Sequence, residues 1–142
     1  MGFDVKFIKL SSQINSFRTS WIIKKILGLT KKIIRPKILL LGLSYKKNIE
    51  DTRESAGVKF FTKLLDEKFK VNFLDYLVNK INLNGKTYKS MKLNYKNLSR
   101  FGVVIICSDH DIYNYEKIYK FSNLIVDLRN RYKFDDHKLI KI

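Results

Sequence analysis

Hydrophobic positions separate an N-terminal helical stretch from a longer part in which strands and helices alternate. Over residues 5–29 apolar side chains recur at steps of three and four, which predicts a helix. The positions in this pattern are Phe7, Ile8, Ile14, Phe17, Trp21, Ile22, Ile26 and Leu29. Gly28 weakens the pattern, and a basic connector follows with Lys31, Lys32, Arg35 and Pro36. We expect this helix either to pack on the next part or to be the end of something larger.

After residue 36 the pattern changes to short segments of strand length. Strands are predicted over residues 37–43, 70–75, 102–107 and 123–127, and the first, third and fourth are apolar enough to be buried on both faces. Helices are predicted over 55–68, with Ser55 as N-cap, and over 114–121. The sequence between the second and third strands is irregular, with a turn at Asn84-Gly85, a short strand over 88–93 and a short helix over 98–101. Strands alternating with helices predict an α/β fold with a parallel sheet.

Ligands of such sheets bind beyond the carboxyl ends of the strands, where three loops meet: 44–54, 108–113 and 128–133. The first loop places Lys46, Lys47 and Arg53 between a buried strand and the start of a helix. Lysine, arginine and helix N–H groups all favour a phosphate, and Tyr45 adds a flat face and a hydroxyl. Charge alone slightly favours an ordinary solvated connection. The glycine-rich dinucleotide fingerprint and the P-loop are absent from the sequence.

The third loop adds Arg129 and Arg131 to the same edge of the sheet. An equally good alternative pairs these arginines with nearby carboxylates such as Asp135 and Asp136. The sequence therefore leaves open whether the third loop holds a ligand.

In the second loop, Asp109, His110 and Asp111 resemble an acid–base cluster or a metal site. We favour a structural role for His110, with hydrogen bonds that tie the loop to the end of the strand. Cys107 ends a buried apolar run, so we interpret it as a small hydrophobic residue and not a nucleophile. We identify no catalytic residue and no metal ligand in the chain.

The composition is strongly basic, with a formal charge of +16 from 29 Lys and Arg against 13 Asp and Glu. The lysines are scattered, and an Ile-, Asn-, Phe- and Tyr-rich chain is what a drift towards A·T-rich codons produces. A nucleic-acid partner is therefore not favoured, although a basic nucleic-acid-binding module stays as an alternative. The single cysteine excludes an internal disulfide and indicates a reducing, cytoplasmic location. Neither an export signal nor an apolar run long enough to span a membrane is evident.

Residues 38–55, with Gly-Leu-Ser-Tyr-Lys-Lys and Asp-Thr-Arg-Glu-Ser, resemble the C-terminal domain of the UDP-glucose/GDP-mannose dehydrogenase family. Residues 71–76, 103–110 and 126–130 occupy the places of other landmarks of that family, and residues 7–15 look like the tail of its central helix. The chain is most similar to the bacterial branch that oxidises UDP-N-acetylhexosamines. The resemblance implies two parts. Residues 1–35 would be a helix left from the central dimerisation domain plus a connector, and residues 36–142 a Rossmann-like, nucleotide-sugar-binding domain whose parallel sheet is flanked by helices.

That family oxidises the sugar C6 alcohol to a carboxylate in two NAD-dependent steps and supplies precursors of surface polysaccharides. The resemblance implies that Tyr45 and Lys46 contact the nucleotide sugar, with Lys46 near its phosphates. It implies that Arg53 reaches towards NAD held by another domain. Arg129 or Asn130 would approach the substrate, and the resemblance does not decide between them.

The sequence also departs from the family. The NAD fingerprint and the glycine-rich segment with the catalytic cysteine are missing, Ala56 replaces the usual proline, and Asn48 stands where aspartate is common. We therefore expect a chain that is inactive alone: a fragment, a split-gene product or a relic. Its expected partners are a UDP-sugar, a separately encoded NAD-binding half and further copies of itself. A further alternative is that the chain is a regulatory or structural protein. It would dock through its first helix onto a separately encoded catalytic half.

Overall fold

The computed structural model describes residues 2–29 and 36–142 and divides into two units, Met1–Lys32 and Ile33–Ile142. The first unit is a single helix, α1 (Gly2–Leu29), as the periodicity of residues 5–29 predicts. Within it Leu10, Phe17 and Trp21 are exposed. The predicted connector of Lys31, Lys32 and Arg35 lies outside the described residues, as do the side chains of Phe7, Ile8, Ile14 and Leu29. Among the described residues, no helix is both long enough and apolar enough for a membrane span.

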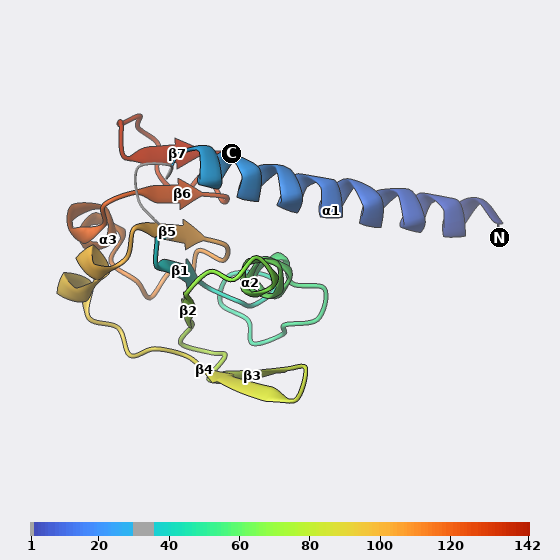
Figure 1. Ribbon diagram of the computed structural model, residues 1–142, viewed down its shortest axis with the longest axis horizontal. Coiled ribbons are helices and arrows are strands. Elements are labelled where there is room, and N and C mark those ends of the chain that lie inside the picture. Colours follow the sequence, from blue (N-terminus) through green and yellow to red (C-terminus); the bar gives the residue numbers. More distant parts are fainter. Residues whose placement is uncertain (1, 30–35) are drawn as a thin grey trace. The chain divides into compact units, whose positions relative to one another are not determined.

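The second unit is built on a five-stranded parallel sheet with the order β2-β1-β5-β6-β7 (Figure 1). The α/β class and the parallel sheet predicted from the sequence are confirmed. The central strands β1 and β5 are buried at every position, which is why their sequences are uninterrupted apolar runs. The strands are β1 (Ile38–Leu41), β2 (Val71–Leu74), β5 (Val103–Ile106), β6 (Ile125–Asp127) and β7 (Leu139–Lys141).

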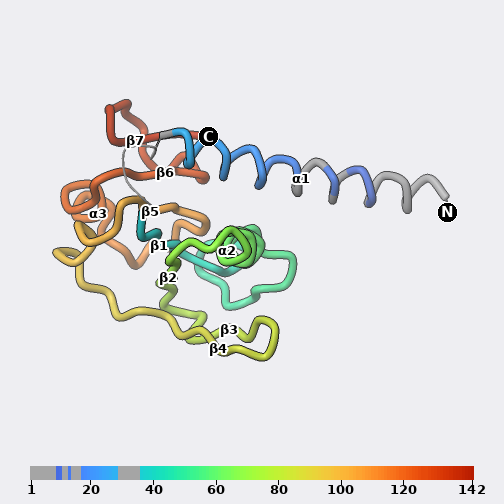
Figure 2. Tube along the Cα trace, viewed as in Figure 1, coloured from blue at the N-terminus to red at the C-terminus, as the bar shows by residue number. Residues whose placement is uncertain are grey.

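Helices cover both faces of this sheet, and the chain can be followed through them in Figure 2. On one face, Phe61 of α2 (Ala56–Asp66) packs edge-on against Phe73 of β2, with ring centroids 5.7 Å apart. On the other face, Leu98 of the 3₁₀ helix η1 (Tyr95–Arg100) and Ile118 of α3 (Tyr115–Phe121) join one hydrophobic cluster with alternate strand residues. The two helices expected over 55–68 and 114–121 are confirmed, and Ser55 is the N-cap of α2.

The segment between β2 and β5 contains a β-hairpin that the sequence analysis did not predict in full. Strands β3 (Lys80–Leu83) and β4 (Lys86–Lys89) pair antiparallel around Asn84 and Gly85, whose φ angles are 51° and 78°. Positive φ at both central residues is the geometry of a tight hairpin turn. The turn was therefore predicted correctly, but the strand expected over 88–93 was placed too far along the chain. Tyr88 packs on Phe61, so the hairpin rests against α2.

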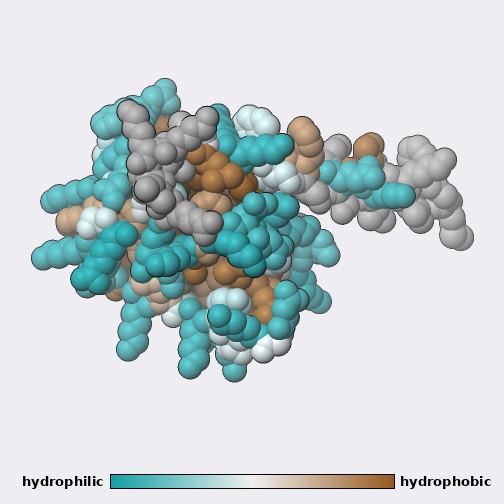
Figure 3. Space-filling view, in the orientation of Figure 1, coloured by the Kyte–Doolittle hydropathy of each residue, from teal (hydrophilic) through white to brown (hydrophobic). Residues whose placement is uncertain are grey.

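The order of strands fixes where a ligand site can form. From β1 the chain continues to β2 on one side, whereas from β5 it continues to β6 on the other side. The loops after β1 and β5 therefore diverge, and ligands of open α/β sheets bind at such a switch point. Hydrophilic side chains project from much of the face of this unit that Figure 3 shows, in keeping with the scattered lysines of the sequence.

Candidate functional site

Two glycines allow the end of β1 to pack tightly against its neighbours. Gly42 has a φ of 83°, and a Cβ atom there would lie 2.4 Å from the Ser108 side chain and backbone. A Cβ on Gly57, in the first turn of α2, would lie 2.8 Å from the Gly42 carbonyl oxygen. The Ser55 hydroxyl donates to the carbonyl of Leu43 and accepts from the N–H of Val58 at 3.3 Å. The start of the loop after β1 is therefore held rigidly between α2 and the loop after β5.

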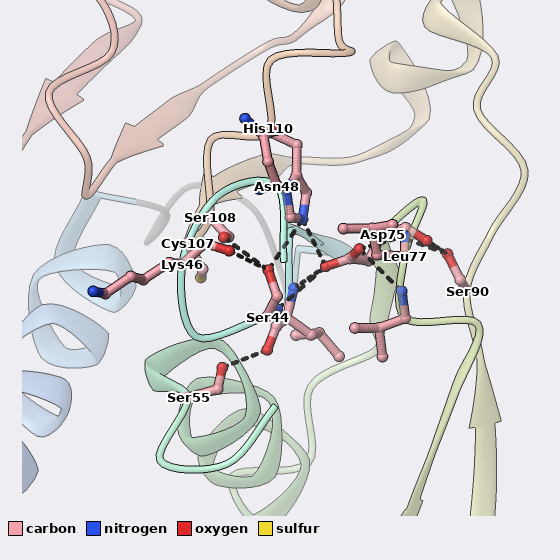
Figure 4. Close-up of polar contacts among 12 residues, drawn as sticks. Ser44, Lys46, Asn48, Ser55, Asp75, Leu77, Ser90, Cys107, Ser108 and His110 are labelled. Atoms are coloured by element: carbon pink, nitrogen blue, oxygen red, sulfur yellow. Dashed lines mark hydrogen bonds and ion pairs between the residues drawn. The ribbon is translucent and has the colours of Figure 1, made fainter. Parts of the chain in front are cut away.

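A buried carboxylate, Asp75, organises the first residues of this loop (Figure 4). Its Oδ2 accepts hydrogen bonds from the backbone N–H groups of Leu43 at 2.8 Å and Ser44 at 3.2 Å. Its Oδ1 accepts from the N–H groups of Leu77 at 2.9 Å and Val78 at 3.1 Å. An internal anion thus occupies the N–H groups of the first two loop residues after Gly42, which are therefore not available to a ligand phosphate.

The environment of Asp75 keeps it ionised. Burial acts to raise the pKa of the Asp75 carboxyl, but hydrogen bonds from His110 and from the N–H groups of Leu77 and Leu43 outweigh burial and lower the pKa. The carboxylate is consequently a fixed structural charge at neutral pH.

His110 is fully buried and connects three rim segments. Its Nε2 lies 3.0 Å from Asp75 Oδ2 and 3.2 Å from the Ser44 hydroxyl, while its Nδ1 accepts the backbone N–H of Asn48 at 2.7 Å. Because Nδ1 accepts, it carries no proton, and Nε2 is the nitrogen that donates to the carboxylate. Both Ser44 and Asp75 contact the same nitrogen, so the three side chains do not form a nucleophile–base relay. The hydrogen-bonding role expected for His110 is the one the structure gives it.

Asp111 holds the exposed part of the loop after β1. Asn48 Nδ2 donates to Asp111 Oδ2 at 2.8 Å, and Arg131 Nη1 donates to Asp111 Oδ1 at 2.9 Å. Lys47 Nζ lies 3.5 Å from the same carboxylate. Hydrogen bonds from Arg131 and Asn48 lower the pKa of Asp111 to about 2. Arg131 also lies 3.5 Å from Asp109. Its charge is therefore offset by two carboxylates of the loop after β5, and not by Asp135 or Asp136.

Arg129, in the third predicted loop, contacts the first predicted loop and the residue that follows β5. Its Nε donates to the carbonyl of Cys107 at 2.8 Å, and its Nη2 donates to the carbonyl of Tyr45 at 3.1 Å. Asp127, buried at the end of β6, accepts from the Arg129 N–H at 3.0 Å and so shapes the turn from which the guanidinium extends. No carboxylate pairs with this guanidinium within the part of the chain that the structure describes. The alternative in which Arg129 pairs with Asp135 or Asp136 is wrong.

Tyr45, whose carbonyl accepts from this guanidinium, and the following residue Lys46 are both exposed. Lys46 Nζ lies 5.6 Å from the centroid of the Tyr45 ring, and among residues 2–29 and 36–142 no carboxylate pairs with it. The Lys46 side chain points away from the buried network in Figure 4. Lys46 and Arg129 are therefore cations of the rim whose charges are not offset by acidic partners in the described residues.

The other two expected ligand-binding residues have different surroundings. Arg53 is 88% exposed and pairs with Asp51 inside the same loop, with Nη2 at 2.9 Å from Oδ2. This pairing lowers the pKa of Asp51 to about 2. Asn130 is exposed with a φ of 53°, a left-handed conformation that asparagine tolerates better than most residues.

The site contains no activated nucleophile among the groups that the structure describes. Cys107 is buried, and burial raises the pKa of its thiol to about 12, against the smaller opposing effect of Arg129. A thiol with that pKa is not a thiolate at neutral pH. No cluster of His, Cys, Asp and Glu suitable for a metal ion occurs among the described residues. The groups that the described rim exposes include cations and hydroxyls, which suit an anionic ligand.

Sequence reasoning missed three residues on which this site depends: Asp75, Ser44 and Ser108. Ser44 Oγ donates to the Lys46 carbonyl at 2.8 Å and lies 3.1 Å from Ser108 Oγ. Asp75 could have been noticed as the first charged residue after a strand, a common position for functional groups in parallel sheets. The serines carry no signal beyond their place after apolar runs.

Comparison with known proteins gives consistent matches. A family model described as the UDP-glucose/GDP-mannose dehydrogenase family, UDP binding domain, matches residues 39–134. A UDP-N-acetyl-D-mannosamine dehydrogenase from Methanocaldococcus jannaschii is 27% identical over 138 residues, covering 96% of this chain and 30% of that protein. A UDP-glucose 6-dehydrogenase from Rickettsia prowazekii is 29% identical over 143 residues, covering 89% of this chain and 31% of that protein.

A solved structure of a UDP-D-ManNAc dehydrogenase from Pyrococcus horikoshii matches the fold with a TM-score of 0.65 and 25% sequence identity. The match covers 92% of this chain and 31% of that structure. The chain therefore spans 30–31% of the length of these relatives.

Proposed function

The chain belongs to the UDP-glucose/GDP-mannose dehydrogenase family and contains its UDP binding domain, and from this premise we propose that its rim loops bind the diphosphate of a UDP-sugar. The observation that carries the proposal is that two cations in contact with Tyr45, Lys46 near its ring and Arg129 at its backbone carbonyl, lack an acidic partner in the described residues. A diphosphate supplies negative charge to which both of these cations can bind. Charge-assisted hydrogen bonds of this kind are among the strongest that proteins make.

The surroundings of Lys46, Arg129 and Tyr45 support the contacts proposed for them. Lys46 is a flexible point charge for the phosphates, and the guanidinium of Arg129 keeps N–H groups beyond the two that hold the Cys107 and Tyr45 carbonyls. The exposed ring of Tyr45 offers a flat surface and a hydroxyl to the nucleotide. Asn130 follows Arg129 in the same turn and is the second candidate for a contact with the sugar. Arg53 is assigned to NAD because it is exposed and because the resemblance to the family implies this role.

The dehydrogenase reaction needs parts that these 142 residues do not contain. We propose that an NAD-binding domain and a catalytic cysteine segment come from another stretch of the protein or from a separate chain. The substrate assigned to the complete assembly is a UDP-sugar whose C6 alcohol is oxidised to a carboxylate with NAD as hydride acceptor. Self-association of the chain is part of the same proposal. The described rim supplies binding and orientation to this reaction.

A calorimetric titration of the 142-residue chain with UDP, UDP-N-acetylglucosamine and uridine tests the binding proposal. Saturable binding of the two diphosphates, with at least tenfold weaker binding of uridine, is the expected result, because the site is built for the diphosphate. A short DNA duplex at the same ionic strength is the control, because it detects binding that depends only on the positive charge of the chain. If a demonstrably folded chain binds the duplex but neither UDP nor the UDP-sugar, the proposal is wrong.

A further inference from the structure

His110 contacts the basic loop on both sides of Lys46. Directly, its Nδ1 accepts the backbone N–H of Asn48 at 2.7 Å. Indirectly, its Nε2 lies 3.2 Å from Ser44 Oγ, which in turn donates to the carbonyl of Lys46 at 2.8 Å. Because the Ser44 proton is used for that carbonyl, Ser44 Oγ can only accept from Nε2, and it shares the single Nε2 proton with Asp75 Oδ2. One buried imidazole therefore fixes the backbone at residues 46 and 48.

The partners of the two imidazole nitrogens differ in whether they have other hydrogen bonds. The carboxylate on the Nε2 side, Asp75, also accepts four backbone N–H groups and remains satisfied if the imidazole is removed. The N–H of Asn48, in contrast, has His110 Nδ1 as its acceptor. Asn48 has a φ of 63°, a backbone conformation that needs support from its surroundings. Loss of the Nδ1 contact should therefore release the loop more than loss of the Nε2 contact.

The rings of Tyr76 and Tyr113 enclose His110 and limit how far it can turn. They meet the imidazole edge-on, with centroids 4.9 Å and 6.0 Å away. Asp75 contacts the same imidazole, which is fully buried. These contacts hold the imidazole in one orientation, so each nitrogen keeps its own partners.

We propose that His110 is a positioning residue for diphosphate binding, and that it acts through the Nδ1–Asn48 contact by fixing the backbone that carries Lys46. This inference rests on the proposed function for its ligand. The contact fixes the backbone next to Lys46 before the ligand arrives, and preorganisation of this kind reduces the cost of binding.

Two amide substitutions separate the nitrogens. In His110→Asn the side-chain oxygen can take the place of Nδ1 and accept from Asn48, whereas in His110→Gln the amide nitrogen can take the place of Nε2 and donate to Asp75. The measurements are the UDP dissociation constant and the exchange rate of the Asn48 amide hydrogen in each full-length variant. We expect His110→Gln to weaken UDP binding by about tenfold and to speed the Asn48 exchange, as the loss of one hydrogen bond does. His110→Asn is expected to lose about threefold or less.

If both variants lose UDP affinity equally and in proportion to their loss of stability, His110 is only a core residue. That result would overturn the inference. Should wild-type chain fail to bind UDP, the proposed function fails, yet the amide exchange at Asn48 still decides whether Nδ1 positions the loop. If neither His110 variant folds, Ser44→Ala removes only the link on the Nε2 side and should leave the exchange of the Asn48 amide hydrogen as in wild type, with the exposed Ser99→Ala as control. A folded Ser44→Ala variant whose Asn48 amide exchanges as fast as in His110→Gln would contradict the inference.

Discussion

Asn48 and Asp111 bind each other through two hydrogen bonds that join the loops after β1 and β5. Asn48 Nδ2 donates to Asp111 Oδ2 at 2.8 Å, and the Asp111 backbone N–H donates to Asn48 Oδ1 at 3.1 Å. Asparagine is one of the few residues that accept a φ of 63°, and its amide can donate where a carboxylate cannot. The asparagine that departs from the family pattern is therefore matched to Asp111 within this chain.

Asn48→Asp is expected to destabilise the chain by about 1 kcal/mol, since it removes a donor and places a second carboxylate against Asp111. The repulsion acts at an exposed position, so the loss should shrink as salt is added. Urea unfolding at low and high salt measures both effects. Asn84→Asp is the control, because Asn84 also has a positive φ but lies in an exposed hairpin turn. Similar losses in the two variants would contradict the role given to Asp111.

The elements that could be predicted are those whose structure depends on a local sequence pattern. β1 and β5 are uninterrupted apolar runs, and Ser55 stands where a helix begins, so these elements follow from local rules. β7 was missed because it is three residues long and contains Lys141. Its place in the sheet comes from parallel pairing with β6, a contact that no local pattern encodes.

The candidate site shows the same limit. Tyr45 and Lys46 stood out because of their residue types, whereas Asp75 looked like any polar residue after a strand. Its role depends on His110, which lies 35 positions further along the chain, and on backbone N–H groups more than 30 positions before it. Single-sequence reasoning finds chemistry that is close in sequence, and this network is assembled from three separate segments, after β1, β2 and β5.

Ala56→Pro is expected to stabilise the chain by about 0.4–1 kcal/mol, because proline restricts the unfolded state and fits the first position of a helix. Ser55 before it has φ −70° and ψ 128°, an extended conformation that proline favours in its predecessor. Urea denaturation at neutral pH is the measurement. Lys59→Pro, which removes the hydrogen bond from Lys59 N–H to the Ser55 carbonyl, should instead cost about 3 kcal/mol. A loss of stability in Ala56→Pro would show that the first turn of α2 is not free to accept the ring.

Gly57→Ala is expected to lower the free energy of unfolding by about 1–3 kcal/mol, since its Cβ would lie 2.8 Å from a backbone oxygen that cannot move away easily. The matched control is Gly28→Ala in α1, where a Cβ meets nothing within 4 Å. That control should be neutral or gain up to about 1 kcal/mol from helix propensity. Thermal and urea unfolding of both variants measure the difference. An unchanged Gly57→Ala midpoint would mean that α2 can shift away from β1.

The Asp75 carboxylate predicts a specific loss of stability in acid. Its pKa is lower in the folded chain than the ordinary value of about 3.9 in an unfolded chain, so its contribution is complete above that value. The contribution is lost as the pH falls through the lower, folded pKa, because protonation then favours unfolding. Asp75→Asn should cost about 1–3 kcal/mol at pH 7 and flatten the decline below pH 4, as measured by urea midpoints. The exposed Asp66→Asn is the control, and identical acid profiles for wild type and Asp75→Asn would refute the assignment.

Lys46→Ala should weaken UDP binding more than Lys47→Ala, although the two lysines are adjacent and equally charged. Lys47 lies 3.5 Å from Asp111, so part of its charge is already offset, whereas Lys46 has no acidic partner among the described residues. Loss of a charge-assisted contact predicts at least a tenfold increase in the dissociation constant for Lys46→Ala and about twofold for Lys47→Ala. Calorimetry at two salt concentrations measures both. Equal losses at both positions would indicate attraction by general charge, and the diphosphate contact assigned to Lys46 would then be wrong.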